Sequence, residues 1–103
     1  MISFTARLKA LAGKEAEATE HLKTMVKSVN KHEPGAMAYI CHASPDHPGE
    51  FLFYEVYADK DAYDAHGATP HFENLKRLFG EVLDPDFGVK IEKLEQVAGF
   101  IRG

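Results

Sequence analysis

Apolar and polar residues alternate at the start of the chain, from Ile2 to Ala10. An alternation with a period of two is typical of a strand that buries one face. From Lys14 to about Lys31 the apolar residues instead recur at steps of three and four, at Ala18, Leu22, Met25, Val26 and Val29. This spacing predicts one amphipathic helix. The sequence Glu33-Pro34-Gly35 should end it, because proline and glycine cannot continue a helix at low cost.

The middle of the chain contains two further apolar runs, separated by turn-forming residues. The run over residues 36–42 is followed by a connection rich in proline, aspartate and glycine, and the run over residues 51–57 is dense in aromatic residues. Turn formers between two such runs are typical of a hairpin loop. The pattern therefore predicts two strands, the second of them buried on both faces.

Two short helices are predicted after the second of these strands. Asp59 can cap a helix over residues 60–66, and Gly67 can end that helix in the left-handed conformation. Thr69-Pro70 supplies a cap followed by a proline in the first turn of the next helix. The apolar stripe of that helix comprises Phe72, Leu75, Leu78, Phe79 and Val82.

A last strand is predicted near the C-terminus, where Val89 and Ile91 alternate with charged residues. The alternation changes phase at Lys93-Leu94, which predicts a β-bulge. The element order is then strand, helix, strand, strand, helix, strand. This order predicts an α+β class and a ferredoxin-like βαββαβ arrangement, with a four-stranded antiparallel sheet and the helices on one face. A chain of 103 residues has room for one core, so residues 1–103 are expected to form a single domain.

The strand over residues 51–57 has apolar side chains on both faces. One face carries Leu52, Tyr54 and Val56, and the other carries Phe51, Phe53 and Tyr57. The helices can cover only one of these faces, so the other face must meet a ligand or another subunit. We expect a homodimer, because most oligomers are symmetric pairs.

The net charge of the chain indicates which classes of partner it is expected not to bind. Twelve Lys and Arg residues against sixteen Asp and Glu residues give a net charge of −4, and no basic run occurs. We therefore expect neither nucleic acid nor a membrane surface as a partner. The single cysteine, Cys41, cannot form an internal disulfide, and no apolar run approaches the ~20 residues that span a bilayer. Arg7 and Lys9 interrupt any signal-peptide core, so a cytoplasmic protein is expected.

Glu55 is the most informative polar residue, because it shares a strand face with Phe51, Phe53 and Tyr57. A buried carboxylate needs a partner. His66 and His71 are the nearest candidates in the sequence, since they bracket the junction of the two short helices. A carboxylate that orients an imidazole would provide a general base for a substrate hydroxyl. A structural hydrogen bond that holds the short helices to the sheet is the open alternative.

The two histidines differ in their expected environments. His71 lies near the start of its helix, where the helix dipole favours the neutral ring that suits a base. His66 lies near the end of the preceding helix, where the charged ring and a salt bridge with Glu55 are favoured.

Other residues contribute to a candidate binding site. Tyr39, Tyr57 and Phe72 could line an aromatic slot for a flat substrate, although aromatic residues at these spacings also fit a core. Arg7 is the candidate for contact with a phosphorylated ligand. The residues that could bind metal in one region, Cys41, His42 and His47, lack the spacing of a zinc site. No metal, haem, flavin or other cofactor is therefore predicted.

The segment from Pro34 to Phe72 resembles the antibiotic biosynthesis monooxygenase family, also called quinol monooxygenase-like. The resemblance is most specific in three pieces: Glu-Pro-Gly at residues 33–35, Phe-Tyr-Glu-x-Tyr at 53–57 and Ala-His-x-x-Thr-Pro-His-Phe at 65–72. It implies a dimeric α+β barrel in which two sheets pack face to face. It also implies cofactor-independent oxygenation of a small aromatic substrate of the phenol or quinol type.

The same resemblance leaves other functions open, since related proteins cleave haem or isomerise small phosphorylated sugars. The chain has no Trp, and strand 2–10 has no Asn, which argues against haem degradation. A monooxygenase is the predicted function. The alternatives are an isomerase of a small hydroxyketone or phosphorylated sugar, and a non-catalytic dimeric module that binds a small molecule.

Overall fold

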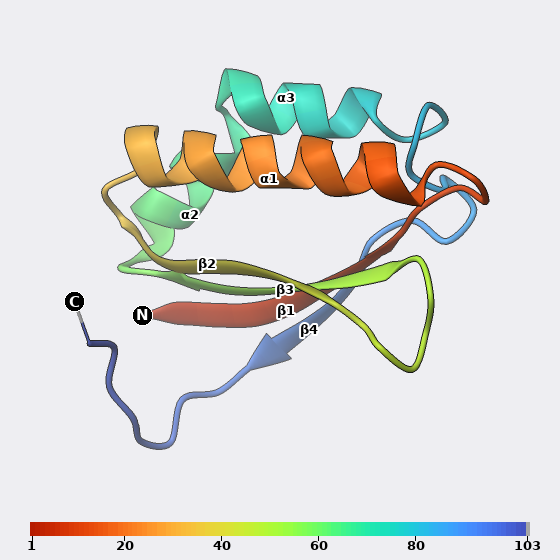
Figure 1. Ribbon diagram of the computed structural model, residues 1–103. Helices are drawn as coiled ribbons and strands as arrows, with labels where there is room; N and C mark the ends of the chain where they lie inside the picture. The colour runs from red at the N-terminus through yellow and green to blue at the C-terminus, as the bar shows by residue number, and fades with distance from the viewer. Residues whose placement is uncertain (103) are drawn as a thin grey trace.

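The computed structural model describes residues 1–102 and shows a four-stranded antiparallel sheet with helices packed on one face (Figure 1). The strands are β1 (Ile2–Lys9), β2 (Ala36–Ala43), β3 (Glu50–Tyr57) and β4 (Lys90–Leu94). The helices are α1 (Glu15–His32), α2 (Lys60–Gly67) and α3 (Pro70–Arg77). The predicted ferredoxin-like α+β fold is confirmed.

The strand order β2-β3-β1-β4 puts β1 and β3 in the centre of the sheet. Their register pairs Phe4 with Glu55 and Ala6 with Phe53. Paired residues of adjacent strands point to the same face of a sheet, so these four side chains all face the helices. Phe4, Ala6 and Phe53 belong to the buried core, and Glu55 is therefore held within an apolar layer.

The ends of the predicted helices require two corrections. Gly67 is the last residue of α2 and does not adopt the left-handed conformation that the sequence predicted. The residue that caps the helix is Ala68, with a φ of −99°. The next helix, α3, ends at Arg77, five residues before the predicted stripe ends at Val82. Leu78 and Val82 are nevertheless buried, because a tight turn joins them through a 2.9 Å hydrogen bond from the Val82 amide to the Leu78 carbonyl.

The bulge predicted in the last strand is wrong. Strand β4 pairs with β1 without interruption from Arg7–Lys90 to Ser3–Leu94. All five residues of β4 are exposed, so burial does not require apolar and polar residues to alternate there. The change of phase at Lys93-Leu94 therefore does not correspond to a bulge. The register shift lies in β2 instead, between Ala36 and Ala38.

The helix caps place the two short helices over β3. The Asp59 carboxylate accepts a hydrogen bond of 2.8 Å from the Ala62 amide at the start of α2. The Thr69 hydroxyl accepts one of 3.1 Å from the Phe72 amide at the start of α3. Both caps agree with the sequence prediction. The two caps fix the first turns of α2 and α3, and the first turn of α3 carries His71. The Thr69 hydroxyl also donates to the His66 carbonyl, which holds the last turn of α2 to the start of α3.

Gly35, which immediately precedes β2, packs tightly against α2. A Cβ atom on Gly35 would lie 2.5 Å from the Cβ of Ala62. Gly35→Ala is therefore expected to lower the free energy of unfolding by about 1–3 kcal/mol, which urea denaturation would measure. Gly67→Ala is the matched control, because its Cβ would meet nothing within 4 Å and alanine favours a helix. Equal stability of Gly35→Ala and the parent protein would contradict this packing.

The opposite face of the sheet carries no helix (Figure 1). The segment after β4 runs along this side, where residues 96–101 lie beside Met1, Tyr54 and Val56. Several apolar side chains stay exposed here, including Ile40, Leu94, Val97 and Phe100. Among residues 1–102, none of the helices combines the length and apolar character needed to cross a lipid bilayer.

Candidate functional site

A cavity of about 360 Å³ lies between the helix-covered face of the sheet and the helices α2 and α3. Its walls are mainly apolar and include Phe4, Leu8, Phe53, Phe72, Leu75 and Ile91. Glu55 and His66 also line it, and they come from β3 and from the last turn of α2. A ligand in this cavity would meet an imidazole and a carboxyl group in apolar surroundings, which is the usual composition of a small-molecule site.

The hydrogen-bond partner of Glu55 is Tyr57, two residues along the same strand. The Tyr57 hydroxyl donates to Oε1 of Glu55 at 2.7 Å, and both side chains are buried. Burial raises the pKa of Glu55 to about 7; the Tyr57 hydrogen bond opposes this change and the nearby Glu33 adds to it. Burial and the neighbouring Glu55 likewise raise the pKa of Tyr57. At neutral pH the Glu55 carboxyl group can therefore act as a donor or as an acceptor.

His66 lies between two carboxyl groups from different parts of the chain. Its Nδ1 lies 2.9 Å from both carboxylate oxygens of Glu33, and its Nε2 lies 4.0 Å from Oε1 of Glu55. The first contact is a hydrogen bond, whereas the second is too long for one. Glu33 follows the end of α1, and its backbone amide donates to the Val29 carbonyl at 2.9 Å.

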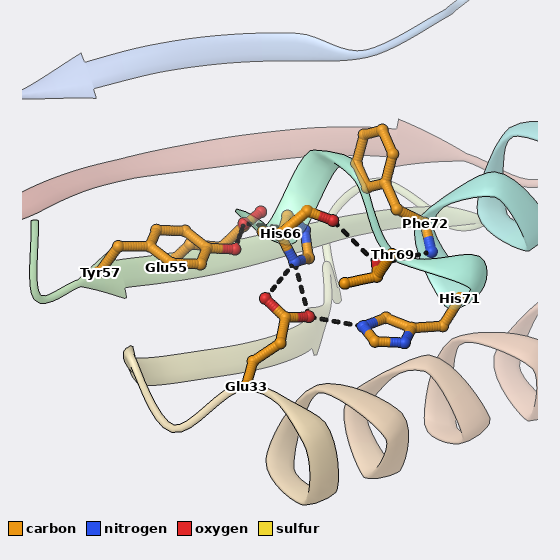
Figure 2. Close-up of polar contacts among 7 residues, drawn as sticks. All are labelled: Glu33, Glu55, Tyr57, His66, Thr69, His71 and Phe72. Atoms are coloured by element: carbon orange, nitrogen blue, oxygen red, sulfur yellow. Dashed lines mark hydrogen bonds and ion pairs between the residues drawn. The ribbon is translucent and has the colours of Figure 1, made fainter. Parts of the chain in front are cut away.

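His71 also binds Glu33. Its Nε2 contacts Oε2 of that carboxylate, so Glu33 bridges the two histidines (Figure 2). The sequence proposed His66 and His71 as partners of Glu55, but the hydrogen bonds of both rings go to Glu33 instead. The structure thus divides the polar residues into two groups: Glu55 with Tyr57, and Glu33 with His66 and His71.

Aromatic rings fix the plane of His66. Its ring centroid lies 5.4 Å from that of Tyr39, 5.3 Å from Tyr57 and 5.1 Å from Phe72. The Thr69 hydroxyl donates to the His66 carbonyl at 2.8 Å, which also fixes the backbone of this residue. The imidazole is therefore held from several sides, so its orientation at the cavity wall is fixed.

The residues proposed from the sequence occupy four locations. Four of them line the cavity: Tyr39, Glu55, His66 and Phe72. Tyr57 is buried beside Glu55, and His71 is hydrogen-bonded to Glu33; neither of them lines the cavity. Arg7 does not line the cavity, and its side chain forms an ion pair of 3.7 Å with Glu50.

Glu33 is the site residue that sequence reasoning missed. The sequence indicated that Glu33-Pro34-Gly35 ends a helix and belongs to the family resemblance, but it assigned Glu33 no role in the site. Its contact with His66 spans 33 positions along the chain, and no local periodicity marks such a contact. The one feature of the sequence that could have pointed to Glu33 is its place: it is a carboxylate at the end of a long helix, where the chain returns to the sheet.

Glu33, His66 and His71 are also the group that could hold a metal ion in the described part of the chain. One ligand atom from each lies within 4.8 Å of the others. Both ring nitrogens that would bind the ion are already engaged with the carboxylate as hydrogen-bond partners. A cation would have to displace these protons, which makes its binding dependent on pH.

The comparisons with known proteins agree with this architecture. The model of the family described as antibiotic biosynthesis monooxygenase matches residues 1–78. A proposed antibiotic biosynthesis monooxygenase from Caulobacter crescentus is 29% identical, with a TM-score of 0.84 over 94% of this chain and 90% of that chain. A protein of unknown function from Nitrosomonas europaea is 24% identical, with a TM-score of 0.85 over 99% of this chain and 94% of that one.

A curated relative extends the comparison to a cyanobacterium. An uncharacterized protein of Synechocystis is 28% identical over 67 residues, which are 65% of this chain and 46% of that protein. The match thus spans less than half of the cyanobacterial protein. The family model, in contrast, covers most of the present chain, including Glu33, Glu55 and both histidines of the site. The chain belongs to the antibiotic biosynthesis monooxygenase family.

Proposed function

We propose that the protein is a cofactor-independent monooxygenase that acts on a small phenol or quinol in this cavity. The observation that carries the proposal is the position of His66, which reaches an apolar cavity beside a carboxyl group. A neutral imidazole there can remove the proton of a substrate hydroxyl. Family membership supports oxygen as the co-substrate.

The reaction balances without an external reductant. His66 takes the hydroxyl proton, and the resulting phenolate is electron-rich enough to reduce dioxygen. One oxygen atom forms a new bond to a ring carbon, and the other leaves as water with two hydrogens from the substrate. A quinol and dioxygen thus give a hydroxyquinone and water, and the four electrons that reduce dioxygen all come from the quinol.

Three other cavity residues have roles in this proposal. Tyr39 and Phe72 both pack against His66 and line the cavity, so they would contact the flat ring of the substrate. Glu55, with its pKa of about 7, would hydrogen-bond to the substrate oxygen in either protonation state. Apolar walls would keep water away from the oxygenated intermediate.

Oxygen uptake with a panel of quinols tests this function. The purified protein, with no added metal or flavin, should consume one dioxygen per quinol and give a product that contains one atom of ¹⁸O from ¹⁸O₂. His66→Asn is the matched inactive control. Absence of uptake above that control with every quinol would contradict the oxygenase proposal and favour the binding module.

An isomerase is the second candidate, because the same base could move a proton within a hydroxyketone. Lys76 lines the cavity and could contact a phosphate, a role that the sequence had suggested for Arg7. Lys76 is already paired with Glu73 at 3.1 Å, however, which weakens this alternative. Proton exchange of phosphorylated hydroxyketones in heavy water would distinguish the isomerase.

A homodimer built through the helix-free face of the sheet is the proposed assembly. Ile40 and Leu94 are 49% and 39% exposed on this face, and Phe100 is 78% exposed in the segment that follows β4. Light scattering after size exclusion should give the mass of a dimer at micromolar concentration. Ile40→Glu should shift the mass toward the monomer, because it would bury a charge in the interface. A monomeric parent protein would contradict the assembly.

A further inference from the structure

Glu33 and His71 are hydrogen-bonded to each other beside His66 (Figure 2). Neither residue lines the cavity, so neither can touch a bound substrate. Glu33 is nevertheless buried, with 8% of its surface exposed, and both of its oxygens accept hydrogen bonds. Burying a carboxylate costs free energy unless it is hydrogen-bonded. Because Glu33 bonds to His66, and His66 lines the cavity, Glu33 can influence a bound substrate through His66.

The carboxylate decides which nitrogen of His66 carries the proton. A carboxylate can only accept hydrogen bonds, so the Nδ1 atom 2.9 Å from it must carry a proton. A neutral imidazole has one N–H group, which leaves the lone pair on Nε2. Nε2 is the nitrogen on the side of Glu55, which lines the cavity. The contact with Glu33 thus leaves His66 with its basic nitrogen toward the substrate.

His71 holds the carboxylate in place. Its Nε2–H group donates to Oε2, one of the two oxygens that also face His66. The ring of His71 stacks on His32 at a centroid distance of 6.2 Å, and the Glu33 amide is bonded to the end of α1. Glu33 is therefore anchored by α1 and α3 while it contacts α2.

The charged and titratable groups around His66 come from several elements. Glu33 follows α1, Tyr39 lies on β2, Glu55 and Tyr57 lie on β3, and His71 lies on α3. Once His66 accepts a proton, its positive charge lies 2.9 Å from the Glu33 carboxylate and 4.0 Å from Glu55. The shorter, hydrogen-bonded contact is the stronger one, because charge-assisted hydrogen bonds weaken steeply with distance.

We infer that Glu33, held by His71, is a positioning residue that fixes His66 as the Nδ1–H tautomer and stabilises its protonated form during catalysis. The inference deepens the proposed function and rests on it for the catalytic part. The tautomer part is independent of any activity, because it concerns the free protein. The two parts can therefore fail separately.

Nitrogen NMR of the imidazole rings tests the tautomer. In ¹⁵N-labelled parent protein at a pH where His66 is neutral, its Nδ1 should give a protonated signal and its Nε2 a signal of a bare nitrogen. Signals are assigned by their loss in His66→Asn. A protonated Nε2 and a bare Nδ1 in neutral His66 would overturn the inference, whatever the activity of the protein.

Kinetics of Glu33→Gln test the positioning. The glutamine amide can donate to Nδ1 or accept from it, so both tautomers should appear in the NMR spectrum. The kcat for a quinol should fall by at least about tenfold and by up to about 10⁴-fold, the loss known for a carboxylate that orients a catalytic histidine, with KM little changed because residue 33 does not line the cavity. Glu81→Gln, which makes the same chemical change at an exposed position that does not line the cavity, is the control and should keep both properties.

Two outcomes would overturn the positioning role. One is a Glu33→Gln protein with the parent tautomer and the parent kcat. The other is the binding of a cation. If one equivalent of Zn²⁺ raises the melting temperature and shifts the ring signals of both His66 and His71, this cluster is a metal site. If the parent protein consumes no oxygen but shows the expected tautomer, the oxygenase proposal fails and the tautomer assignment stands.

Discussion

Replacing His66 with asparagine is expected to lower the turnover of a quinol by about 10²-fold to 10⁴-fold, which is the usual contribution of general acid–base catalysis. The asparagine amide nitrogen occupies nearly the position of Nδ1, so it can still donate to Glu33. The variant has no counterpart of Nε2, and the cavity loses its base. Oxygen consumption at saturating quinol measures the effect.

The exposed His21 on α1 provides the control for this variant. His21→Asn makes the same chemical change at a place that lines none of the cavity, so its turnover should equal that of the parent. Circular dichroism and the melting temperature should show that both variants are folded. Parent-like turnover in His66→Asn would remove His66 from the mechanism and leave Glu55 as the base to be tested.

The strands β1 and β3 were predictable because burial imposes a pattern on them. Phe4, Ala6 and Leu8 face the core and alternate with more accessible residues, so the period of two is visible in the sequence. Strand β4 has no buried residue in the chain, and its apparent bulge does not exist. The apolar stripe up to Val82 predicted correctly that Leu78 and Val82 are buried, but it did not predict that the helix ends at Arg77. A turn can bury the same side chains as a helix.

The site was predictable to a similar, partial extent. Glu55 stood out because a carboxylate on an apolar strand face is costly to bury, and it does line the cavity. Its hydrogen bond to Tyr57 joins two residues of the same strand, but the alternation along that strand indicates which residues share a face and not which of them bond to each other. The bridge from Glu33 to both histidines depends on how α1, α2 and α3 pack together, and one sequence does not contain that information.

The hydrogen bond between Glu55 and Tyr57 changes what is expected of Glu55→Gln. Burial raises the pKa of Glu55 from 4.5 to about 7, so the folded protein binds this proton more tightly than the unfolded chain does. The stability that Glu55 contributes is complete below its unfolded pKa and is lost as the pH rises through about 7. At alkaline pH the native protein holds a buried carboxylate that its surroundings disfavour.

Glutamine resembles the neutral form of Glu55 at every pH and can still accept the Tyr57 hydrogen bond. Glu55→Gln should therefore equal the parent in stability at about pH 4.5 and become more stable as the pH rises, with a difference on the order of 3 kcal/mol at about pH 8. Urea denaturation across this range measures the difference. Other titrating groups are common to both proteins and cancel.

The matched control is Glu50→Gln at the other end of β3. It removes a partly exposed ion pair of 3.7 Å with Arg7, so its effect should stay below about 1 kcal/mol at both ends of the pH range. A Glu55→Gln protein that is less stable than the parent by about 3–5 kcal/mol at about pH 8 would contradict the prediction that the buried carboxylate destabilises the fold at this pH. Glu55 would then be one half of a buried charged pair with His66, and the 4.0 Å between Oε1 and Nε2 would be the contact that stabilises the fold.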